Sequence, residues 1–177
     1  MAELQGGLPV ILNSPKDRGV LRSIVVRPVH GERLNPVTSQ VSLARGVHGD
    51  HWAIACWKTL ADGSPDPDVQ ICMMNARCIE LIAGPAENWP PAGDNLFIDM
   101  DLTPENMPPG QRFSIGSAEF EVTPVAHNGC AKFVERFGRD AVVFVNTGEG
   151  KRLRLRGIYA RVTRDGRITA GDSVTKL

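Results

Sequence analysis

Glycine and proline divide this 177-residue chain into short pieces. The sequence holds 18 glycines and 13 prolines, spread over its whole length. Both residues interrupt regular structure, glycine because its backbone is unusually free and proline because it lacks a backbone N–H. This punctuation favours short strands joined by turns, and most connections are too short for repeated strand–helix–strand units. The sequence therefore predicts a β-rich fold with a few short helices and disfavours a doubly wound parallel sheet.

The composition is that of a globular protein, and it excludes several broad classes. Hydrophobic residues make up 42% and charged residues 23%. The 20 Lys and Arg balance the 20 Asp and Glu, so no overall field attracts nucleic acid or an anionic membrane. The longest apolar run, residues 52–57, is far shorter than the ~20 residues that span a bilayer. The first residues lack the basic start and apolar stretch of a signal peptide. We expect a cytoplasmic protein that binds neither nucleic acid nor membrane.

Hydrophobic periodicity and turn residues predict the order of the elements. Strands are expected at 21–29, 37–43, 69–73, 96–102 and 152–162, with hairpin turns at 116–117 and 165–166 and a last short strand after residue 172. Helices are expected after Asn75, ending at Gly84, and after Gly129, ending at Gly138. Residues 141–145 fit either a helix or a strand. We expect an irregular lead-in at 1–18 and one domain at 19–177, a β-rich barrel with helices on its rim.

Of the four cysteines, Cys130 is the one that the sequence places in a reactive setting. It follows Asn128-Gly129 in the first turn of an expected helix, where free backbone amides stabilise a thiolate, with His127 and Lys132 nearby. A thiolate there ligates a soft metal or carries sulfur. The alternative is a core thiol, because Cys130 shares an apolar stripe with Phe133. Cys56, Cys72 and Cys78 are expected in the core, and no spacing fits a common zinc pattern.

Two further groups are weaker candidates. His48-Gly49-Asp50-His51 offers two imidazoles and one carboxylate for a metal, but such loops more often hold their own backbone. Arg152, Arg154 and Arg156 would share one face of a strand, either to bind phosphate or as a solvated face opposite two leucines.

Four segments, in this order along the chain, resemble the MOSC domain, the C-terminal module of molybdenum-cofactor sulfurases. They are residues 46–51 (GVHGDH), 93–102 (GDNLFIDMDL), 110–123 leading to Cys130, and 156–160 (RGIYA) with Asp165-Gly166 and Gly171-Asp172 behind them. The chain resembles a small stand-alone member of this family. The resemblance implies a MOSC-type β-barrel and identifies Cys130 as the functional cysteine, as a ligand of molybdenum in a pterin cofactor or as a persulfide.

The resemblance also implies roles for other residues and for partners. Asn75, Asn95 and Arg156 are expected to bind the cofactor, and His127 is expected to act beside Cys130 in catalysis by shuttling a proton. Some relatives reduce N-hydroxylated compounds, which implies a small-molecule substrate and a separate reductase as electron donor. No lysine site for pyridoxal phosphate is expected.

Three functions stay open at this point. The first is a molybdenum-dependent reductase of N-hydroxylated small molecules or bases. The second is a non-redox sulfur carrier, or a module that handles the molybdenum cofactor, with a persulfide on Cys130 and a sulfur-transfer partner. The third is a binding module without chemistry.

Overall fold

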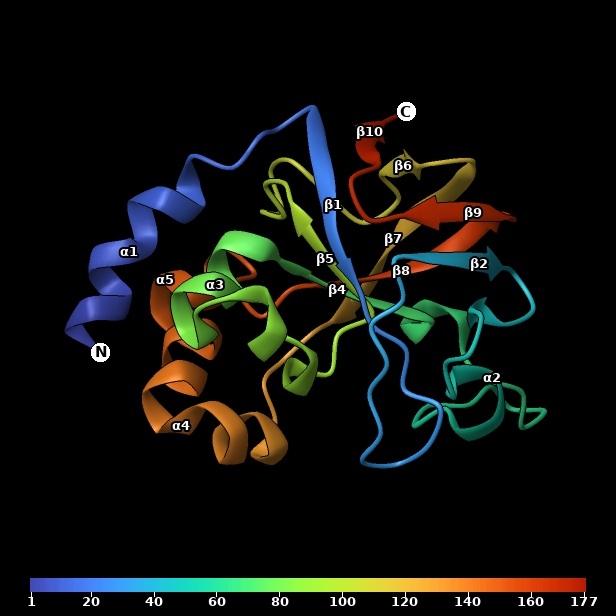
Figure 1. Ribbon diagram of the computed structural model, residues 1–177, viewed down its shortest axis with the longest axis horizontal. Coiled ribbons are helices and arrows are strands. Elements are labelled where there is room, and N and C mark those ends of the chain that lie inside the picture. The colour runs from blue at the N-terminus through green and yellow to red at the C-terminus, as the bar shows by residue number, and fades with distance from the viewer.

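The computed structural model describes all 177 residues and contains a closed barrel of seven strands (Figure 1). Around the barrel the order is β1-β10-β6-β7-β8-β4-β5. The barrel strands are β1 (Arg18–Ile24), β4 (Ile71–Asn75), β5 (Leu96–Asp99), β6 (Arg112–Ile115), β7 (Ala118–Ala126), β8 (Ile158–Arg164) and β10 (Ser173–Lys176). All neighbours are antiparallel except β4 and β5, which run parallel and are linked through a helix. The predicted β-rich barrel with helices is confirmed.

A second, three-stranded sheet flanks the barrel and corrects one prediction. It consists of β3 (Gly46–Val47), β2 (Thr38–Ser42) and β9 (Gly166–Thr169), in that order. Asp165-Gly166 was expected to turn a β8–β9 hairpin, but β9 pairs with β2 instead. At this corner the chain passes very close to β7, since a Cβ on Gly166 would lie 2.5 Å from the Ala118 nitrogen. Asp165 then accepts a hydrogen bond from the backbone of Leu43, which fixes the new direction.

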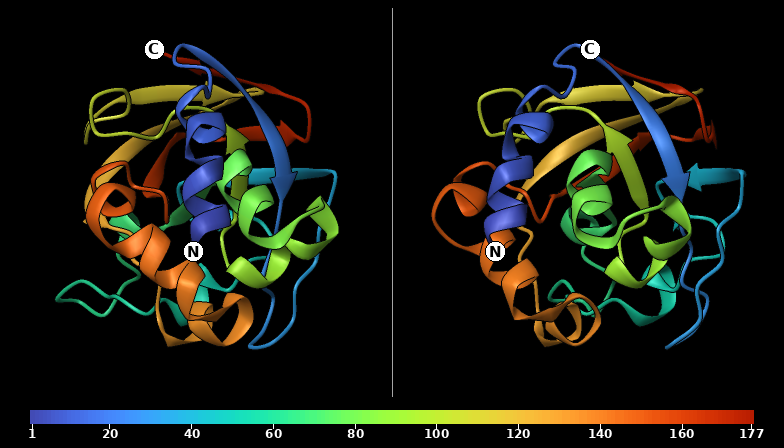
Figure 2. Two further views of the ribbon diagram at one scale, coloured as in Figure 1. Left: turned by 90° about the vertical axis from the view of Figure 1, so that its left-hand side faces the viewer. Right: turned by 60° about the vertical axis from the view of Figure 1, so that its left-hand side comes forward.

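The helices gather on one side of the barrel, at the left of Figure 1 and facing the viewer in Figure 2. They are α1 (Ala2–Leu12), α3 (Ala76–Ala83), α4 (Ala131–Asn146) and α5 (Gly148–Arg152). The one-turn helix α2 (Trp52–Ala55) lies on the opposite side. Three short 3₁₀ helices are formed by Pro67–Val69, Ala86–Asn88 and Pro90–Ala92. No helix combines the length and the apolar character needed to cross a bilayer.

The N-terminal segment is a helix, which corrects the irregular lead-in expected for residues 1–18. Leu4, Leu8 and Ile11 recur at helical spacing, and they pack against the apolar layer between the helices and the barrel. This contact outweighs the poor helix propensity of Gly6, Gly7 and Pro9, because tertiary burial routinely overrides propensity.

The segment after Cys130 also differs from expectation. Gly138 has non-helical backbone angles, as expected for a helix end, but a second helical segment continues to Asn146 and settles residues 141–145 as helix. The strand expected at 152–162 begins only at Ile158, because α5 and a turn with Arg154 at φ 53° precede it. Leu153 and Leu155 are buried as their spacing suggested, but the three arginines do not share a strand face.

Two apolar clusters hold the fold together. One fills the barrel with 22 buried residues, and the other packs 15 residues between the barrel and the helices. The side chains of strand β4 contribute to both clusters. Met73 packs inside the barrel and Met74 packs in the outer layer, because successive side chains of a strand point to opposite faces.

Candidate functional site

Cys130 lies at the surface, at the residue that precedes α4. It is the exposed cysteine of the four, while Cys72 and Cys78 are buried and Cys56 is half-buried. Its side chain makes no capping hydrogen bond to the helix. The preceding peptide is held by Asn146, whose amide accepts from the Gly129 N–H at 2.8 Å and donates to the Gly129 carbonyl at 2.9 Å. The thiol is therefore accessible on a backbone that the second half of α4 fixes in place.

A pocket of about 190 Å³ opens beside this segment, between the end of β7 and the turn that leads into β8. No carboxylate lines it, and its polar side chains are Thr123, His127, Asn128, Lys151, Arg154 and Arg156. Three cations around one concave space are suited to an anionic group such as phosphate.

A buried ion pair lies at the base of the pocket. The Arg156 Nη1 atom lies 2.8 Å and 3.0 Å from the two carboxylate oxygens of Asp94, and its Nη2 donates to the Ala92 carbonyl. The guanidinium also sits 4.9 Å from the ring centre of Phe133 in α4. Burial raises the pKa of Asp94, and the charge of Arg156 opposes that rise. The pair joins the loop before β5 to the turn before β8.

His127 is buried next to this pair. Its Nδ1 lies 3.6 Å from Asp94, beyond hydrogen-bonding distance, and has no other partner, while its ring lies 4.5 Å from that of Tyr159. Burial, together with the positive charges of Arg156 and Arg27, lowers the pKa of His127 well below its usual value. The imidazole is therefore neutral at neutral pH.

A second buried network lies behind the pocket. It joins Arg27 to Asp50 of the 48–51 motif and to Asn95 of the 93–102 motif. Arg27 donates to both carboxylate oxygens of Asp50, to the Asn95 amide oxygen at 3.1 Å and to the Gly93 carbonyl. The Asn95 amide also accepts from the backbone of Cys72 and donates to Asp50. Burial by itself would raise the pKa of Asp50, but its hydrogen bonds to Arg27 hold that pKa below its usual range.

The loop at residues 48–51 serves this network. Asp50 binds Arg27 and accepts from the backbone of Trp52, and His48 contacts the Ser42 hydroxyl at 2.9 Å. No group of three or more His, Cys, Asp or Glu side chains is arranged to hold a metal ion. The loop holds its own backbone in place, which is the interpretation that the sequence analysis favoured for this motif.

The structure brings some of the expected site residues together and separates others. His127 and Arg156 line the same pocket. His127 lies three positions before Cys130 in the chain, and Arg156 is paired with Asp94. Asn95 belongs to the Arg27 network. Asn75 caps α3 through the Cys78 N–H, as expected, and its amide donates to Ser14 and Met100, so its polar atoms are engaged inside the fold. Its contact with a cofactor stays a prediction.

Comparison with known proteins identifies the family. The model of the MOSC domain family matches residues 62–175, and the chain belongs to this family, which is associated with the molybdenum cofactor. A search of curated proteins gave no match.

Solved structures share the fold at low sequence identity. The YuaD protein from Bacillus subtilis is 15% identical, with a TM-score of 0.60 over 89% of this chain and 94% of that chain. YiiM from Escherichia coli is 19% identical, with a TM-score of 0.55 over 89% and 69% of the two chains. YiiM from Geobacillus stearothermophilus is 16% identical, with a TM-score of 0.53 over 90% and 75%.

Arg27, Asp94 and Tyr159 are site residues that the sequence analysis did not single out. A charge directly after the apolar run Ile24-Val25-Val26 is the one signal that marks Arg27, since a buried strand end carries a charge only when it is paired. Asp94 and Tyr159 lie in segments that carry the family resemblance, but nothing local marks their roles, because their neighbours come from distant parts of the chain.

Proposed function

We propose that this protein is a molybdenum-pterin oxidoreductase that reduces N-hydroxylated small molecules, with Cys130 as the protein ligand of the metal. The observation that carries the proposal is that the exposed Cys130 thiol follows, by two positions, a residue that lines the pocket, Asn128. That pocket is lined by three cations and no carboxylate. Such a pair of features suits a cofactor with a soft metal at one end and a phosphate at the other.

The residues present fit such a cofactor. Two buried polar atoms of the pocket, Arg156 Nε and His127 Nδ1, have no partner within the chain. Buried polar groups are nearly always satisfied, so two in one pocket favour a ligand there. Lys151 and Arg154 add charge for a phosphate, and the Cys130 thiolate is the donor type that molybdenum accepts.

Each residue has a distinct role in this proposal. When bound, the cofactor supplies the two-electron chemistry that cleaves an N–O bond. Cys130 anchors the metal, and Arg156, held rigidly by Asp94, orients the phosphate. His127 rests as a neutral imidazole, and it would relay a proton toward the leaving oxygen by giving up its N–H proton as the other ring nitrogen accepts one. A separate reductase delivers the electrons.

Elemental analysis tests the proposal first. The protein is purified from a host that makes the molybdenum cofactor, as wild type, as Cys130→Ala and as the control variant Cys56→Ala, which removes a half-buried cysteine. We expect near-stoichiometric molybdenum in the wild type and in Cys56→Ala, and loss of the metal in Cys130→Ala. Reduction of an N-hydroxylated base should then fall to background in Cys130→Ser.

The alternative is a non-redox sulfur carrier, which the exposure of Cys130 also suits because a persulfide must reach its acceptor. Wild-type protein without molybdenum and with the mass of one added sulfur on Cys130 would contradict the reductase and support this carrier.

A further inference from the structure

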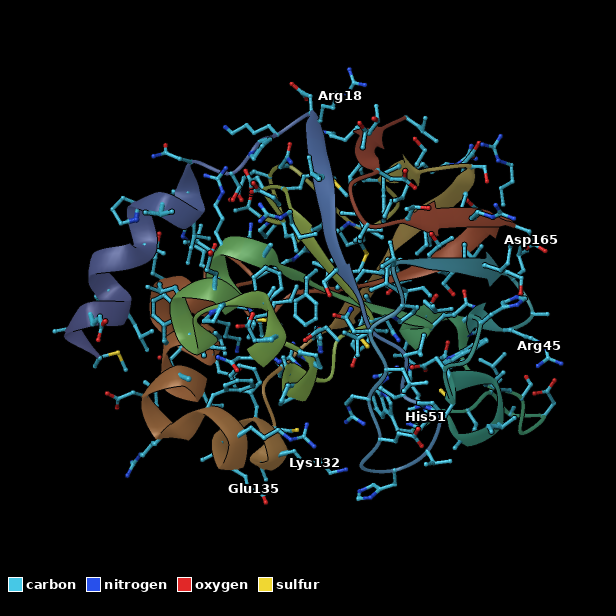
Figure 3. The ribbon with its side chains drawn as sticks, in the orientation of Figure 1. Arg18, Arg45, His51, Lys132, Glu135 and Asp165 are labelled. Atoms are coloured by element: carbon cyan, nitrogen blue, oxygen red, sulfur yellow. The ribbon has the colours of Figure 1, made fainter.

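Four basic side chains lie on two segments that meet at the start of α4, the helix that Cys130 precedes, and outside the pocket described above. His30 and Arg33 come from the loop between β1 and β2, and Lys132 and Arg136 come from the first turns of α4. The Lys132 ammonium lies 3.5 Å from His30 Nε2, which joins the two elements. In Figure 3, Lys132 projects from the start of α4 at the bottom of the molecule, where this loop passes. We call these four residues the basic rim.

The rim is tied to the buried arginine network. Arg136 Nη1 donates to the Pro91 carbonyl at 2.6 Å and passes close to Gly93, where an added Cβ would lie 3.9 Å from it. Arg27 donates to the carbonyl of the same Gly93 at 2.8 Å. The two guanidinium groups therefore flank the short loop at residues 91–93. The hydrogen bond to Pro91 holds the Arg136 side chain in place.

The positive charge of the rim is not neutralised within the chain. Arg33, Lys132 and Arg136 form no ion pair with any carboxylate, whereas Arg27 is fully paired with Asp50. Burial, with the like charges of Arg136 and Arg27, lowers the pKa of Arg33, and Arg33 Nε is buried without a partner. Glu32 and Glu135 lie on the same two segments but form no ion pair with these cations, so no carboxylate is engaged at the rim.

We propose that the basic rim is an oxyanion subsite, so that the molecules which reach Cys130 carry a phosphate or carboxylate group. For an N-hydroxylated base this means the nucleoside monophosphate rather than the free base. The inference rests on the proposed function in taking Cys130 as the reacting residue. Convergent cations that repel one another cost folding energy, and a bound oxyanion recovers it through charge-assisted hydrogen bonds.

Alkylation of Cys130 by an anionic and a neutral reagent tests the rim directly. The thiolate displaces iodide from iodoacetate or iodoacetamide, forming an S–C bond as the C–I bond breaks, and peptide mass spectrometry follows Cys130 alone. Removal of cations changes the thiolate fraction equally for both reagents, so the ratio of the two rates isolates recognition of the carboxylate. We expect this ratio to fall about tenfold in Arg33→Gln/Arg136→Gln.

Arg139→Gln is the matched control, because Arg139 is exposed on α4 and has no hydrogen bond or ion pair in the structure. It should leave the ratio at the wild-type value. Equal ratios in the wild type, the control and the double variant would overturn the proposal. These measurements use protein without cofactor, so a failed molybdenum analysis leaves them interpretable.

Protection experiments identify the source of the oxyanion. Adenosine 5′-monophosphate should slow alkylation of Cys130 by iodoacetamide in the wild type but not in the double variant, while adenosine should not protect either protein. Equal protection by adenosine would contradict oxyanion recognition. In protein from a host that makes the cofactor, the double variant should keep its molybdenum. Loss of the metal would assign the rim to the cofactor's phosphate and overturn a substrate subsite.

Discussion

At the scale of single residues, the site depends on charges that are buried in pairs. Arg156 with Asp94 and Arg27 with Asp50 each carry a full guanidinium–carboxylate contact behind the pocket. Removing one partner of such a pair leaves an uncompensated buried charge, which is far more costly than the net worth of the pair. These pairs fix the positions of the loop at residues 93–95 and of the turn before β8.

His127 gives this arrangement a measurable pH dependence. Its pKa in the folded protein lies well below that in the unfolded chain, so unfolding binds a proton once the pH falls below about 6.5. The stability that it contributes is complete above that pH and is lost as the pH falls toward the folded pKa. Between pH 7.5 and 5.5 we expect the free energy of unfolding to drop through His127 by roughly 1 kcal/mol.

Urea denaturation at several pH values, on wild type and His127→Gln, measures this term. The difference in slope between the two proteins is the readout, because the other titrating groups cancel. Parallel pH curves would show that His127 titrates normally in the folded state.

At the scale of elements, close backbone contacts decide where strands begin. Gly157 precedes β8 at φ 115°, and a Cβ there would lie 2.0 Å from the Met73 carbonyl of β4. The same Cβ would approach His127 Nδ1 to 3.2 Å. This one residue therefore aligns β8 with β4 and spaces both from the pocket.

Gly157→Ala should destabilise the fold more than Gly171→Ala does. Both glycines have positive φ, but the added Cβ at Gly171 meets nothing within 4 Å. The comparison separates the steric clash from the backbone strain that both variants share. We expect an excess loss of about 1–3 kcal/mol in the free energy of unfolding for Gly157→Ala, measured in guanidinium chloride. Equal losses would mean that the β4 carbonyl moves away without cost.

At the scale of the whole molecule, the helical layer depends on a core of its own outside the barrel. Ile11 of α1 is buried in that layer, whereas its neighbour Val10 is 58% exposed. Ile11→Ala should cost about 2–4 kcal/mol in thermal or denaturant unfolding, while Val10→Ala should change stability by less than about 0.5 kcal/mol. Similar small effects at both positions would mean that α1 does not contribute to the folded core.

Much of the fold was predictable from local patterns. The hairpin turning at Gly116-Ser117, the N-cap at Asn75 and the alternation of buried residues all follow from turn chemistry and periodicity, and the structure confirms them. The helix at 2–12 was missed because Gly6, Gly7 and Pro9 lower helix propensity, and only its contact with the outer layer stabilises it. The strand expected at 152–162 was wrong only in its first part, before Ile158, because alternating burial also fits a tight turn.

The sequence by itself indicated a β-rich barrel with short helices and marked Cys130 as the candidate cysteine, since glycine, proline and apolar spacing act over a few residues. The tertiary structure alone decided that Cys130 is exposed, that Arg27 pairs with Asp50, and that Lys132 lies beside His30. These contacts join residues 23 to about 100 positions apart, and their charges become significant only where folding removes water from between them.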